Sequence, residues 1–345
     1  MKDPLISVNL LLFQPGAYLR PCLNSIFAQS YKNFELLIID NNSQDGTVEK
    51  VKELLPPVDQ VIKWRFLENN ENLGYAKGHN LGIRESSGEL VALVNQDVIL
   101  DKDFLKNIAK VFEANEQIGS AQGKLLRLKV EKDSFSKTKI IDTVGLCMLK
   151  NRRIIAWGQG QEDAGNFEQG KNIFGTDGAL PVYRRAALED VKIKIGLKEE
   201  YLDESFFMYK EDVDLAWRLL LYGWQSFYLP AALAWHARTA GDSAKTNYFG
   251  IIGERLKINK FSKYQSFKNQ RLMQIKNEQL GLLLRHFFYF APKEIASWIF
   301  VLLFEHYTWK SIKELLGLAP QAWKKRAVIM SKKRVSVSEM EQWFK

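Results

Sequence analysis

Runs of apolar residues alternate with segments of helical periodicity through the first hundred residues of the chain. The apolar runs are short and nearly continuous, as in strands that are buried on both faces. This order predicts an α/β fold, a Rossmann-like, mostly parallel sheet with helices on both faces and ligands beyond the carboxyl ends of its strands. The apolar runs are residues 6–13, 34–40, 61–68 and 89–97, and the helical segments are residues 18–30, 46–55 and 74–87.

The pattern changes twice further along the chain. From residue 101 to about 191 it is weaker, and the lysine-rich residues 127–139 and glycine-rich residues 157–170 are typical of surface loops or hairpins. Beyond about residue 245, long helical patterns rich in Lys and aromatic residues follow. We therefore expect an α/β domain over residues 1–245 and a helical extension over residues 246–345.

Composition narrows the class of protein. The chain has 345 residues, of which 46% are hydrophobic and 26% charged, as in a folded globular protein rather than a disordered or multi-span membrane protein. Its formal charge of +9 favours anionic partners, which include nucleotide phosphates, lipid headgroups and nucleic acid. Cys22 and Cys147 have no zinc or redox spacing, which favours the cytoplasm. Pro4 and the lack of a small-residue cleavage site favour a buried first strand over a signal peptide.

Two acids, Asp40 and Asp97, each follow a predicted buried strand. An acid at this position is an unusual choice for packing, so the pair marks a candidate site at the carboxyl edge of the sheet. The Asp40 carboxylate could accept the imide N–H of a uracil or thymine base, although it could also bond local backbone. Asn95 and Asp97 are two residues apart in an extended segment, so both side chains could reach one cation or its waters.

Three glycines, Gly74, Gly78 and Gly82, recur every four residues where the third helix is expected. Bare amides at a helix start would favour phosphate. The same spacing would also allow a helix to pack closely on its neighbours. The sequence leaves both interpretations open.

A third cluster places the acids Glu211, Asp212 and Asp214 in the segment "FFMYKEDVDLAWRLLLYGW". Acids in a first helical turn stabilise many helices, and this is the simplest explanation of the cluster. Asp214 and Arg218 are four residues apart and can form an ion pair, which favours a structural role for Asp214.

Five blocks of sequence, in order, resemble family 2 glycosyltransferases, in particular the bacterial rhamnosyltransferase-like group. The resemblance spans residues 5 to 240 and implies a GT-A fold, a nucleoside-diphosphate sugar donor (UDP or dTDP), Mg²⁺ or Mn²⁺, and inversion at the anomeric carbon. The blocks are "SVNLLLFQPGAYLRPCLNSIFAQSYKNFELLIIDNNSQDGT", "ENLGYAKGHNLGI", "LVNQDV", "GTDGALPVYRRAAL" and "FFMYKEDVDLAWRLLLYGWQSFYLPAALAWH".

Carried onto this chain, the resemblance implies a role for each matching residue. Asp212 would be the general base, with Glu211 orienting the loop or an acceptor hydroxyl, and Asp97 and His236 would bind the metal. The implied donor-binding residues are Asp40, Asn42, Gly74, Lys77, Asn80, Asn95 and Gln96, and the implied acceptor-side residues are Asp177, Gly178, Trp217 and Arg218. Two features depart from the family pattern. Leu12 and Gln14 stand where a Thr-Tyr-Asn motif is common, and Asn95 replaces the first acid of the metal motif, which weakens metal binding.

The C-terminal segment contains two apolar runs separated by Pro292, Lys293 and Glu294. Neither run reaches the roughly 18 uncharged residues of a membrane span. Aromatic helices with basic clusters at residues 324–326 and 332–334 suit the surface of an anionic membrane, on its cytoplasmic face. A helical subdomain that packs on the catalytic domain or on a second copy would have the same composition.

Together these features predict an enzyme that moves a sugar, plausibly rhamnose, onto a saccharide or lipid-linked acceptor in envelope polysaccharide synthesis, without a nucleic-acid partner. Two alternatives stay open. A nucleotidyltransferase of similar fold would need paired acids for two metals and a basic triphosphate loop. A non-catalytic nucleotide or saccharide-binding module would explain the missing first acid of the metal motif.

Overall fold

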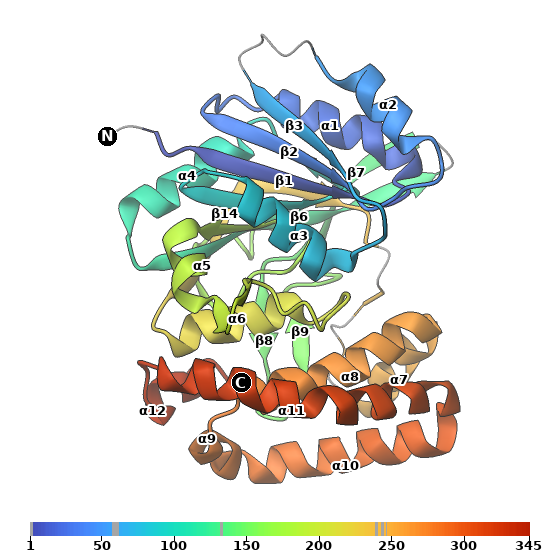
Figure 1. Ribbon diagram of the computed structural model, residues 1–345, viewed down its shortest axis with the longest axis vertical. Coiled ribbons are helices and arrows are strands. Elements are labelled where there is room, and N and C mark those ends of the chain that lie inside the picture. Colours follow the sequence, from blue (N-terminus) through green and yellow to red (C-terminus); the bar gives the residue numbers. More distant parts are fainter. Residues whose placement is uncertain (1–2, 57–61, 132–133, 239–240, 243–244, 246) are drawn as a thin grey trace.

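A computed structural model describes residues 3–56, 62–131, 134–238, 241–242, 245 and 247–345. One mixed sheet of ten strands organises the N-terminal two thirds of the chain (Figure 1). The strands follow the order β10-β14-β6-β11-β4-β1-β2-β3, with β5 paired to β14 and β7 to β6. They are β1 (Ile6–Leu12), β2 (Phe34–Asp40), β3 (Lys63–Glu68), β4 (Leu90–Asn95), β5 (Val98–Leu100), β6 (Ile118–Glu131), β7 (Ser134–Thr143), β10 (Lys171–Ile173), β11 (Pro181–Arg184) and β14 (Gln225–His236).

Helices cover both faces of this sheet, as the sequence predicts. Side chains of α1, α2 and α4 share one buried cluster with one face of the sheet, and those of α3, α5 and α6 pack in a second cluster on the other face. The helices are α1 (Leu19–Phe27), α2 (Thr47–Leu54), α3 (Gly74–Glu85), α4 (Phe104–Ala114), α5 (Arg185–Val191) and α6 (Glu211–Leu221), with a 3-10 turn η1 (Gly16–Tyr18) before α1. Two small hairpins pair β8 (Leu146–Met148) with β9 (Ile154–Ala156) and β12 (Ile193–Ile195) with β13 (Lys198–Glu200).

The four strands β3, β2, β1 and β4 are parallel neighbours, which confirms the predicted half of the sheet. Val61, where the sequence begins the third strand, lies outside the described residues. The register places Asp40 beside Leu12 and Asn95 beside Leu11, so two of the predicted strand-end residues flank the end of β1. The other half differs from a simple doubly wound sheet, because β11 runs antiparallel between β4 and β6.

Helix α3 packs unusually close to the sheet, and its glycines are the reason. A Cβ at Gly78 would lie 2.7 Å from Leu11 Cδ1, and a Cβ at Gly82 would lie 2.7 Å from Ile39 Cδ1. Real side chains do not tolerate such contacts, so the close-packing interpretation explains both residues.

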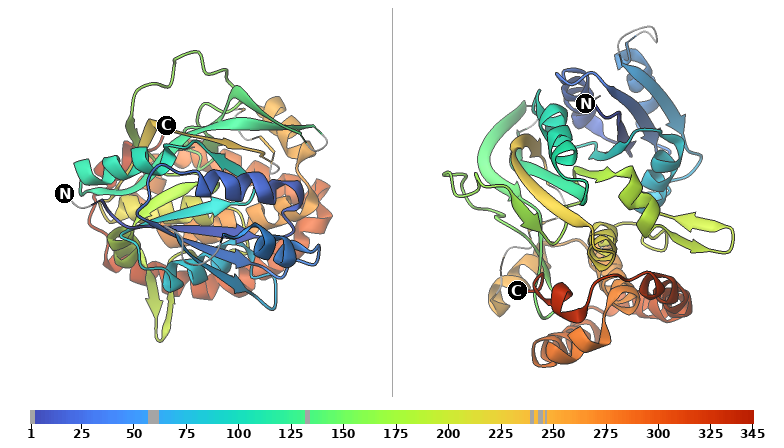
Figure 2. Two further views of the ribbon diagram at one scale, coloured as in Figure 1. Left: turned by 90° about the horizontal axis from the view of Figure 1, so that it is seen from above. Right: turned by 90° about the vertical axis from the view of Figure 1, so that its left-hand side faces the viewer.

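The chain beyond residue 246 is helical and lies against α6, on the side away from α1 and α2 (Figures 1 and 2). Buried residues of α8, α9, α11 and α12 belong to the same cluster as α6, so this region shares a core with the α/β part of the chain. The elements are α7 (Tyr248–Lys257), α8 (Lys260–Asn277), α9 (Leu280–Arg285), α10 (Phe287–Phe304), η2 (His306–Thr308), α11 (Trp309–Ser331) and α12 (Val337–Glu341).

Helix α10 corrects the expectation of two interrupted apolar runs. It is continuous through Pro292 and has 18 residues. By length and composition alone it could cross a membrane. Lys293 and Glu294 continue the helix because both are good helix formers. Glu294 also pairs with Arg271 of α8 at 2.7 Å and with Lys293 at 3.4 Å. The charges that seemed to divide the segment are therefore neutralised within the protein.

Candidate active site

Asp97 and His236 meet at the carboxyl edge of the sheet, as the family resemblance implies. Asp97 lies in the two-residue turn between β4 and β5, and His236 ends β14 opposite Val98 of β5. The backbone of Ala237 donates to the Asp97 carbonyl at 3.0 Å, which fixes the two segments together. As a result, His236 Nε2 lies 3.4 Å from Asp97 Oδ2, and both side chains are largely buried.

Asp142 of β7 lies behind this pair and fixes the histidine ring. His236 Nδ1 is 2.8 Å from Asp142 Oδ2, and the Asp142 side chain is fully buried. Burial alone would lower the pKa of His236, but the carboxylates of Asp97 and Asp142 raise it to about 10. Burial alone would raise the pKa of Asp142, but Arg238 and His236 lower it to about 2. The ring therefore directs Nε2 toward Asp97, in the way that a buried carboxylate orients many metal-binding histidines.

These residues fit a divalent cation. With Nδ1 held by Asp142, Nε2 would bind a metal by releasing its proton, and the Asp97 carboxylate beside it would supply a hard oxygen ligand. Within the described residues no cluster has three or more His, Cys, Asp or Glu ligands. A cation at this position would depend on other oxygens, such as those of a nucleotide or water, to complete its shell.

Arg238 extends the same network to the loop between β10 and β11. Its Nε donates to Asp142 Oδ1 at 2.6 Å, and its Nη2 donates to Asp177 Oδ2 at 3.0 Å. Asp177 in turn accepts from the Ala179 N–H at 3.0 Å, and its own N–H donates to Gln122 Oε1 at 2.8 Å. A continuous chain of charged groups thus connects the Asp97–His236 pair to the loop that carries Gly178.

Asp212 lies on the other side of this loop, in the first turn of α6. The Gly178 N–H donates to Asp212 Oδ2 at 3.0 Å, and the Val213 N–H donates to Oδ1 at 2.8 Å. Tyr75 of α3 holds the loop by donating to the Gly178 carbonyl at 2.6 Å. Burial raises the pKa of Asp212 to about 6, with a further contribution from the negative charge of Asp177. A carboxylate with this pKa can take up a proton near neutral pH.

Glu211, next to Asp212, has a different environment. It is only 5% exposed, and its Oε2 has no hydrogen-bond partner among the described residues. Burial raises the pKa of Glu211 well above its ordinary value, and the charge of Asp212 raises it further. The different environments of the two acids give them different pKa values. Asp212 is therefore the better candidate for a base that is ionised at neutral pH.

The backbone just before these acids is held by the C-terminal helix α8. Tyr209 and Lys210 both adopt left-handed φ angles, +72° and +76°, which are rare for residues with a side chain. Asn269 is fully buried, and its Nδ2 donates to the carbonyls of Met208 at 3.0 Å and Tyr209 at 2.8 Å. Ser262 also donates to the Tyr209 hydroxyl at 2.8 Å. The helical extension therefore supports the conformation that presents Asp212.

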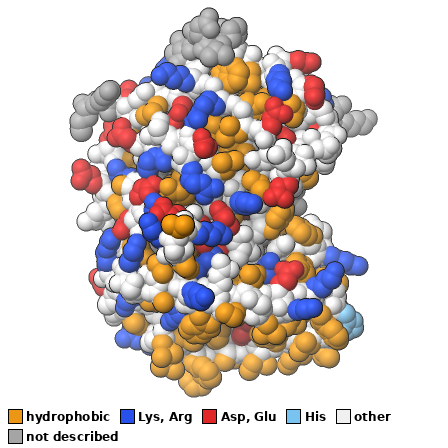
Figure 3. Space-filling model, in the orientation of Figure 1, with side chains coloured by type: hydrophobic (Ala, Val, Ile, Leu, Met, Phe, Trp, Pro, Cys, Tyr) orange, Lys and Arg blue, Asp and Glu red, His pale blue; other side chains and the backbone are white. Residues whose placement is uncertain are grey.

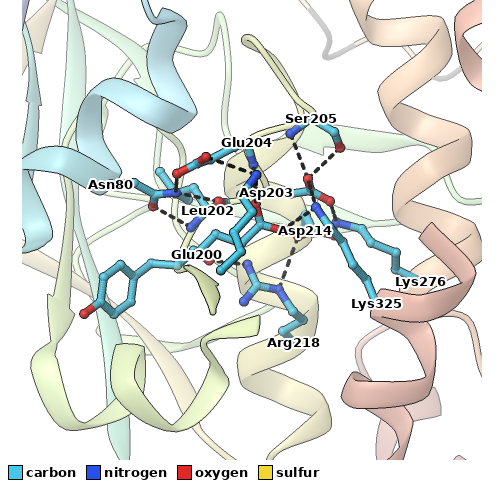
Figure 4. A network of polar contacts seen from close by, with 12 residues as sticks. Asn80, Glu200, Leu202, Asp203, Glu204, Ser205, Asp214, Arg218, Lys276 and Lys325 are labelled. Atoms are coloured by element: carbon cyan, nitrogen blue, oxygen red, sulfur yellow. Dashed lines mark hydrogen bonds and ion pairs between the residues drawn. The ribbon is translucent and has the colours of Figure 1, made fainter. Parts of the chain in front are cut away.

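A buried ion network joins α8 and α11 to α6 and to the loop before it (Figure 4). Lys276 of α8 contacts Asp203 and lies 2.7 Å from Asp214, and Lys325 of α11 lies 2.5 Å from Asp203. The predicted pair of Asp214 with Arg218 is present at 3.2 Å. The structural role expected for Asp214 is confirmed.

The end of β2 contains a carboxylate oxygen without a hydrogen-bond partner among the described residues. Asp40 is 1% exposed, and its Oδ2 accepts from the Ser43 N–H at 2.9 Å. Its Oδ1 is buried and has no partner within the part of the chain that the structure describes. Asn42, two residues further, has φ +63°. A buried acceptor without a donor is costly, so Oδ1 is suited to an N–H from a ligand.

The remaining donor-side candidates differ in what their side chains contact. Gln96 binds the Phe13 backbone through both of its polar atoms, at 2.7 and 3.0 Å, and Lys77 is an exposed partner of Glu71 at 3.6 Å. Asn80 is fully buried and bonds the N–H and carbonyl of Leu202, both at 2.8 Å.

Two further donor-side candidates, Asn95 and Gly74, contact neighbouring segments through their backbone. The Asn95 N–H donates to the Ala179 carbonyl at 3.0 Å, which ties the metal motif to the β10–β11 loop. Gly74 has φ +72°, and a Cβ there would lie 2.4 Å from the Phe207 carbonyl oxygen. A glycine at this position lets the start of α3 approach the loop before Asp212 closely. Donor contact by these residues stays a prediction.

Two acceptor-side assignments are wrong for this conformation. Trp217 and Arg218 are both fully buried, so neither can touch an acceptor. Arg218 instead donates to the carbonyls of Val191 at 2.7 Å and Tyr201 at 2.5 Å. The sequence does not reveal this burial. The C-terminal helices cover the side of α6 that would otherwise face solvent.

Asp142 and Arg238 were missed by the reasoning from sequence. Arg238 had a usable signal, since it stands two residues after His236 in an extended segment and so lies on the same side of the chain. Asp142 had none, because β7 lies in the stretch whose hydrophobic pattern is weak.

A mixed α/β sheet with acids at its carboxyl edge and a helical extension defines a GT-A-like protein, the fold class of nucleotide-sugar transferases. The chain belongs to glycosyl transferase family 2, whose sequence pattern matches residues 8–192, more than half of the chain. It is 24% identical over 232 residues to a poly-beta-1,6-N-acetyl-D-glucosamine synthase of Staphylococcus epidermidis, a match that covers 67% of this chain and 49% of that protein. The chain thus spans about half the length of this curated relative.

Two solved structures share the fold over nearly the whole chain. A mannosyltransferase of Pyrobaculum calidifontis, in complex with GDP-Man and Mn²⁺, aligns with a TM-score of 0.51 at 13% identity and covers 99% of this chain and 88% of its own. TarS of S. aureus, residues 1–349 in complex with UDP-GlcNAc, aligns with a TM-score of 0.51 at 15% identity and covers 98% and 90%. At these identities the likeness shows the fold, including the C-terminal helical region.

Proposed function

We propose that this protein transfers a sugar from a nucleoside-diphosphate donor to a hydroxyl group of a saccharide or lipid-linked acceptor, with inversion at the anomeric carbon. One observation carries the proposal. A single hydrogen-bonded network runs from the Asp97–His236 pair through Asp142, Arg238 and Asp177 to the loop that holds Asp212. In the proposed reaction this network would join a diphosphate-binding group to a base.

Asp212 is the general base of the proposed reaction. Its carboxylate takes the proton of the acceptor hydroxyl, and the acceptor oxygen forms a bond to the anomeric carbon. The bond from that carbon to the diphosphate oxygen breaks at the same time, and its electron pair leaves with the diphosphate. This is a single in-line displacement, so it inverts the configuration. The pKa of Asp212, about 6, leaves the base ionised at neutral pH but still able to accept the proton.

Asp97 and His236 would hold Mg²⁺ or Mn²⁺, which would neutralise the charge that develops on the leaving diphosphate. The Mn²⁺ in the Pyrobaculum mannosyltransferase complex supports this choice. Asp40 would accept the imide N–H of a uracil or thymine base through its unpaired Oδ1, which favours UDP- or dTDP-linked sugars. Rhamnose is the donor sugar that the sequence resemblance favours.

The acceptor side of the proposal rests on the Asp177–Gly178 loop, which lies next to Asp212. The likeness to a poly-beta-1,6-N-acetyl-D-glucosamine synthase supports a role in polysaccharide synthesis. A cytoplasmic location would give the enzyme access to nucleotide sugars.

A panel of nucleotide sugars tests this function. The protein is incubated with Mn²⁺, a mixture of short saccharides and lipid-diphosphate acceptors, and one donor at a time, including dTDP-rhamnose, UDP-GlcNAc and GDP-mannose. Anion-exchange chromatography then measures the nucleotide released, and NMR of the product gives its anomeric configuration. Release of nucleoside diphosphate with inversion supports the proposal. Formation of pyrophosphate would identify a nucleotidyltransferase, and nucleotide binding without turnover of any donor would identify a binding module.

A further inference from the structure

Helix α10 has two opposite faces with different environments. One face packs on α8: Glu294 pairs with Arg271 at 2.7 Å, Ser297 accepts from Arg271 at 3.0 Å, and the ring of Trp298 lies 5.1 Å from that of Phe267. These helix residues recur at three- and four-residue intervals, so they form one stripe along the helix. The polar groups of α10 are therefore turned toward the protein.

The opposite face of α10 is apolar and exposed. Phe288 is 86% exposed and Leu303 is 60% exposed. Hydrophobic side chains line this edge of the molecule, beneath the layer formed by α8 and α11 (Figure 3). Large exposed apolar faces of this kind mark contact surfaces rather than ordinary solvent-exposed positions. The apolar surface comprises Phe288, Tyr289, Ile295, Ile299, Leu302 and Leu303 of α10, with Phe287 and Phe304 at the two ends of the helix and Leu280 and Leu284 of α9.

A basic hollow adjoins the end of this surface, where η2 follows α10. Its lining consists of three lysines, one acid and three aromatic residues: Lys260, Lys310, Lys313, Glu314, Phe261, Tyr264 and Tyr307. All three lysines are exposed. Tyrosine beside lysine is typical of the boundary between water and lipid, where the ring contacts the interface and the ammonium meets anionic headgroups. The surface thus combines apolar side chains with positive charge at its rim.

We propose that the apolar surface of α10 and α9 docks on an anionic lipid bilayer, with α10 lying in the plane of the interface. An in-plane position follows from its two faces, because the stripe with Glu294 and Ser297 stays bonded to Arg271 while the opposite stripe enters the lipid. The lysine hollow binds lipid phosphates at the rim. This inference does not depend on the proposed reaction, since it concerns a surface of the helical region and its readout is binding.

Sedimentation with vesicles tests the docking surface in the full-length protein. Vesicles of phosphatidylcholine with phosphatidylglycerol are compared with phosphatidylcholine alone at low and high salt. We expect binding to the anionic vesicles, weaker binding without phosphatidylglycerol, and a loss at high salt. The double variant Phe288→Glu/Leu303→Glu removes two exposed apolar side chains and adds negative charge, so its partition coefficient should fall at least about tenfold.

Leu197→Glu is the matched control, because Leu197 is fully exposed at the turn between β12 and β13, outside the docking surface. It should bind vesicles like the unchanged protein. Failure of the unchanged protein to sediment with anionic vesicles at low salt would overturn the proposal. So would a concentration-dependent dimer in solution that the double variant abolishes, since a second copy would then cover the surface.

Discussion

Replacing Lys276 by methionine tests whether buried charges fasten the C-terminal helices to α6. The ammonium group of Lys276 contacts Asp203 and Asp214, and these three side chains are at most 1% exposed. Methionine keeps the apolar stem but leaves the two carboxylates short of a partner. Breaking a buried ion pair in this way costs about 3–5 kcal/mol. Lys325 and Arg218 remain beside the carboxylates, so we expect the lower end of that range, about 3 kcal/mol, in the free energy of unfolding.

Urea unfolding followed by tryptophan fluorescence measures this change. Lys52→Met is the control, because Lys52 pairs with Glu68 at 3.1 Å but both side chains are about half exposed or more. An exposed pair contributes at most about 1 kcal/mol. If Lys276→Met is no more destabilising than Lys52→Met, the buried charges do not hold the helices in place and the reasoning is wrong.

The pH dependence of stability gives a second readout of the same network. Burial alone would raise the pKa of Asp203, but Lys276 and Lys325 hold it well below its ordinary value. A carboxyl with a lowered pKa in the folded state stabilises the protein above its unfolded pKa, and that stability is lost as the pH falls. The unchanged protein should therefore lose stability on acidification below about pH 4, and Lys276→Met should lose less.

Three further predictions concern catalysis. Turnover should rise with pH through about 6 and then level off, because the base form of Asp212 predominates above its pKa; a rate that stays flat from about pH 5 to about pH 8 would exclude this base. Chelator should abolish activity, Mn²⁺ or Mg²⁺ should restore it, and Asp97→Ala should raise the metal concentration required; full activity in chelator would refute the metal site. Asn269→Ala should lower kcat roughly tenfold with an unchanged nucleotide Kd, because the backbone before Asp212 loses two hydrogen bonds; a normal kcat would mean that α8 does not position the base.

The parallel half of the sheet could be predicted because each of its strands is marked by residues that are neighbours in the sequence. Each buried strand is a continuous apolar run, and a polar residue marks its end, so Asp40 and Asp97 could be placed at one edge before the structure was known. The pairing of Asp97 with His236 could not be predicted from local pattern, because the two residues are distant in sequence. Only the family resemblance connected them.

Asp142 and Asn269 could not be predicted, because their contacts depend on how distant segments pack together. Asp142 reaches His236 only because β7 pairs with β6, which in turn pairs with β14, and no local pattern records such pairings. The same holds for Asn269, whose role depends on how α8 packs on the loop before Asp212. In α10, Lys293 and Glu294 looked like an interruption because they are charged. No local pattern shows that Glu294 pairs with Arg271 of another helix.

The direct test of the proposed reaction is the turnover of Asp212→Asn with the donor and acceptor identified by the panel. Asparagine keeps the shape of the side chain but cannot take a proton, so calorimetry should show unchanged nucleotide binding while turnover falls at least about 10²-fold. Asp3→Asn, an exposed aspartate near the N-terminus, is the control and should be fully active. Near-normal turnover of Asp212→Asn, with its fold intact by circular dichroism, would contradict the assignment of Asp212 as the base.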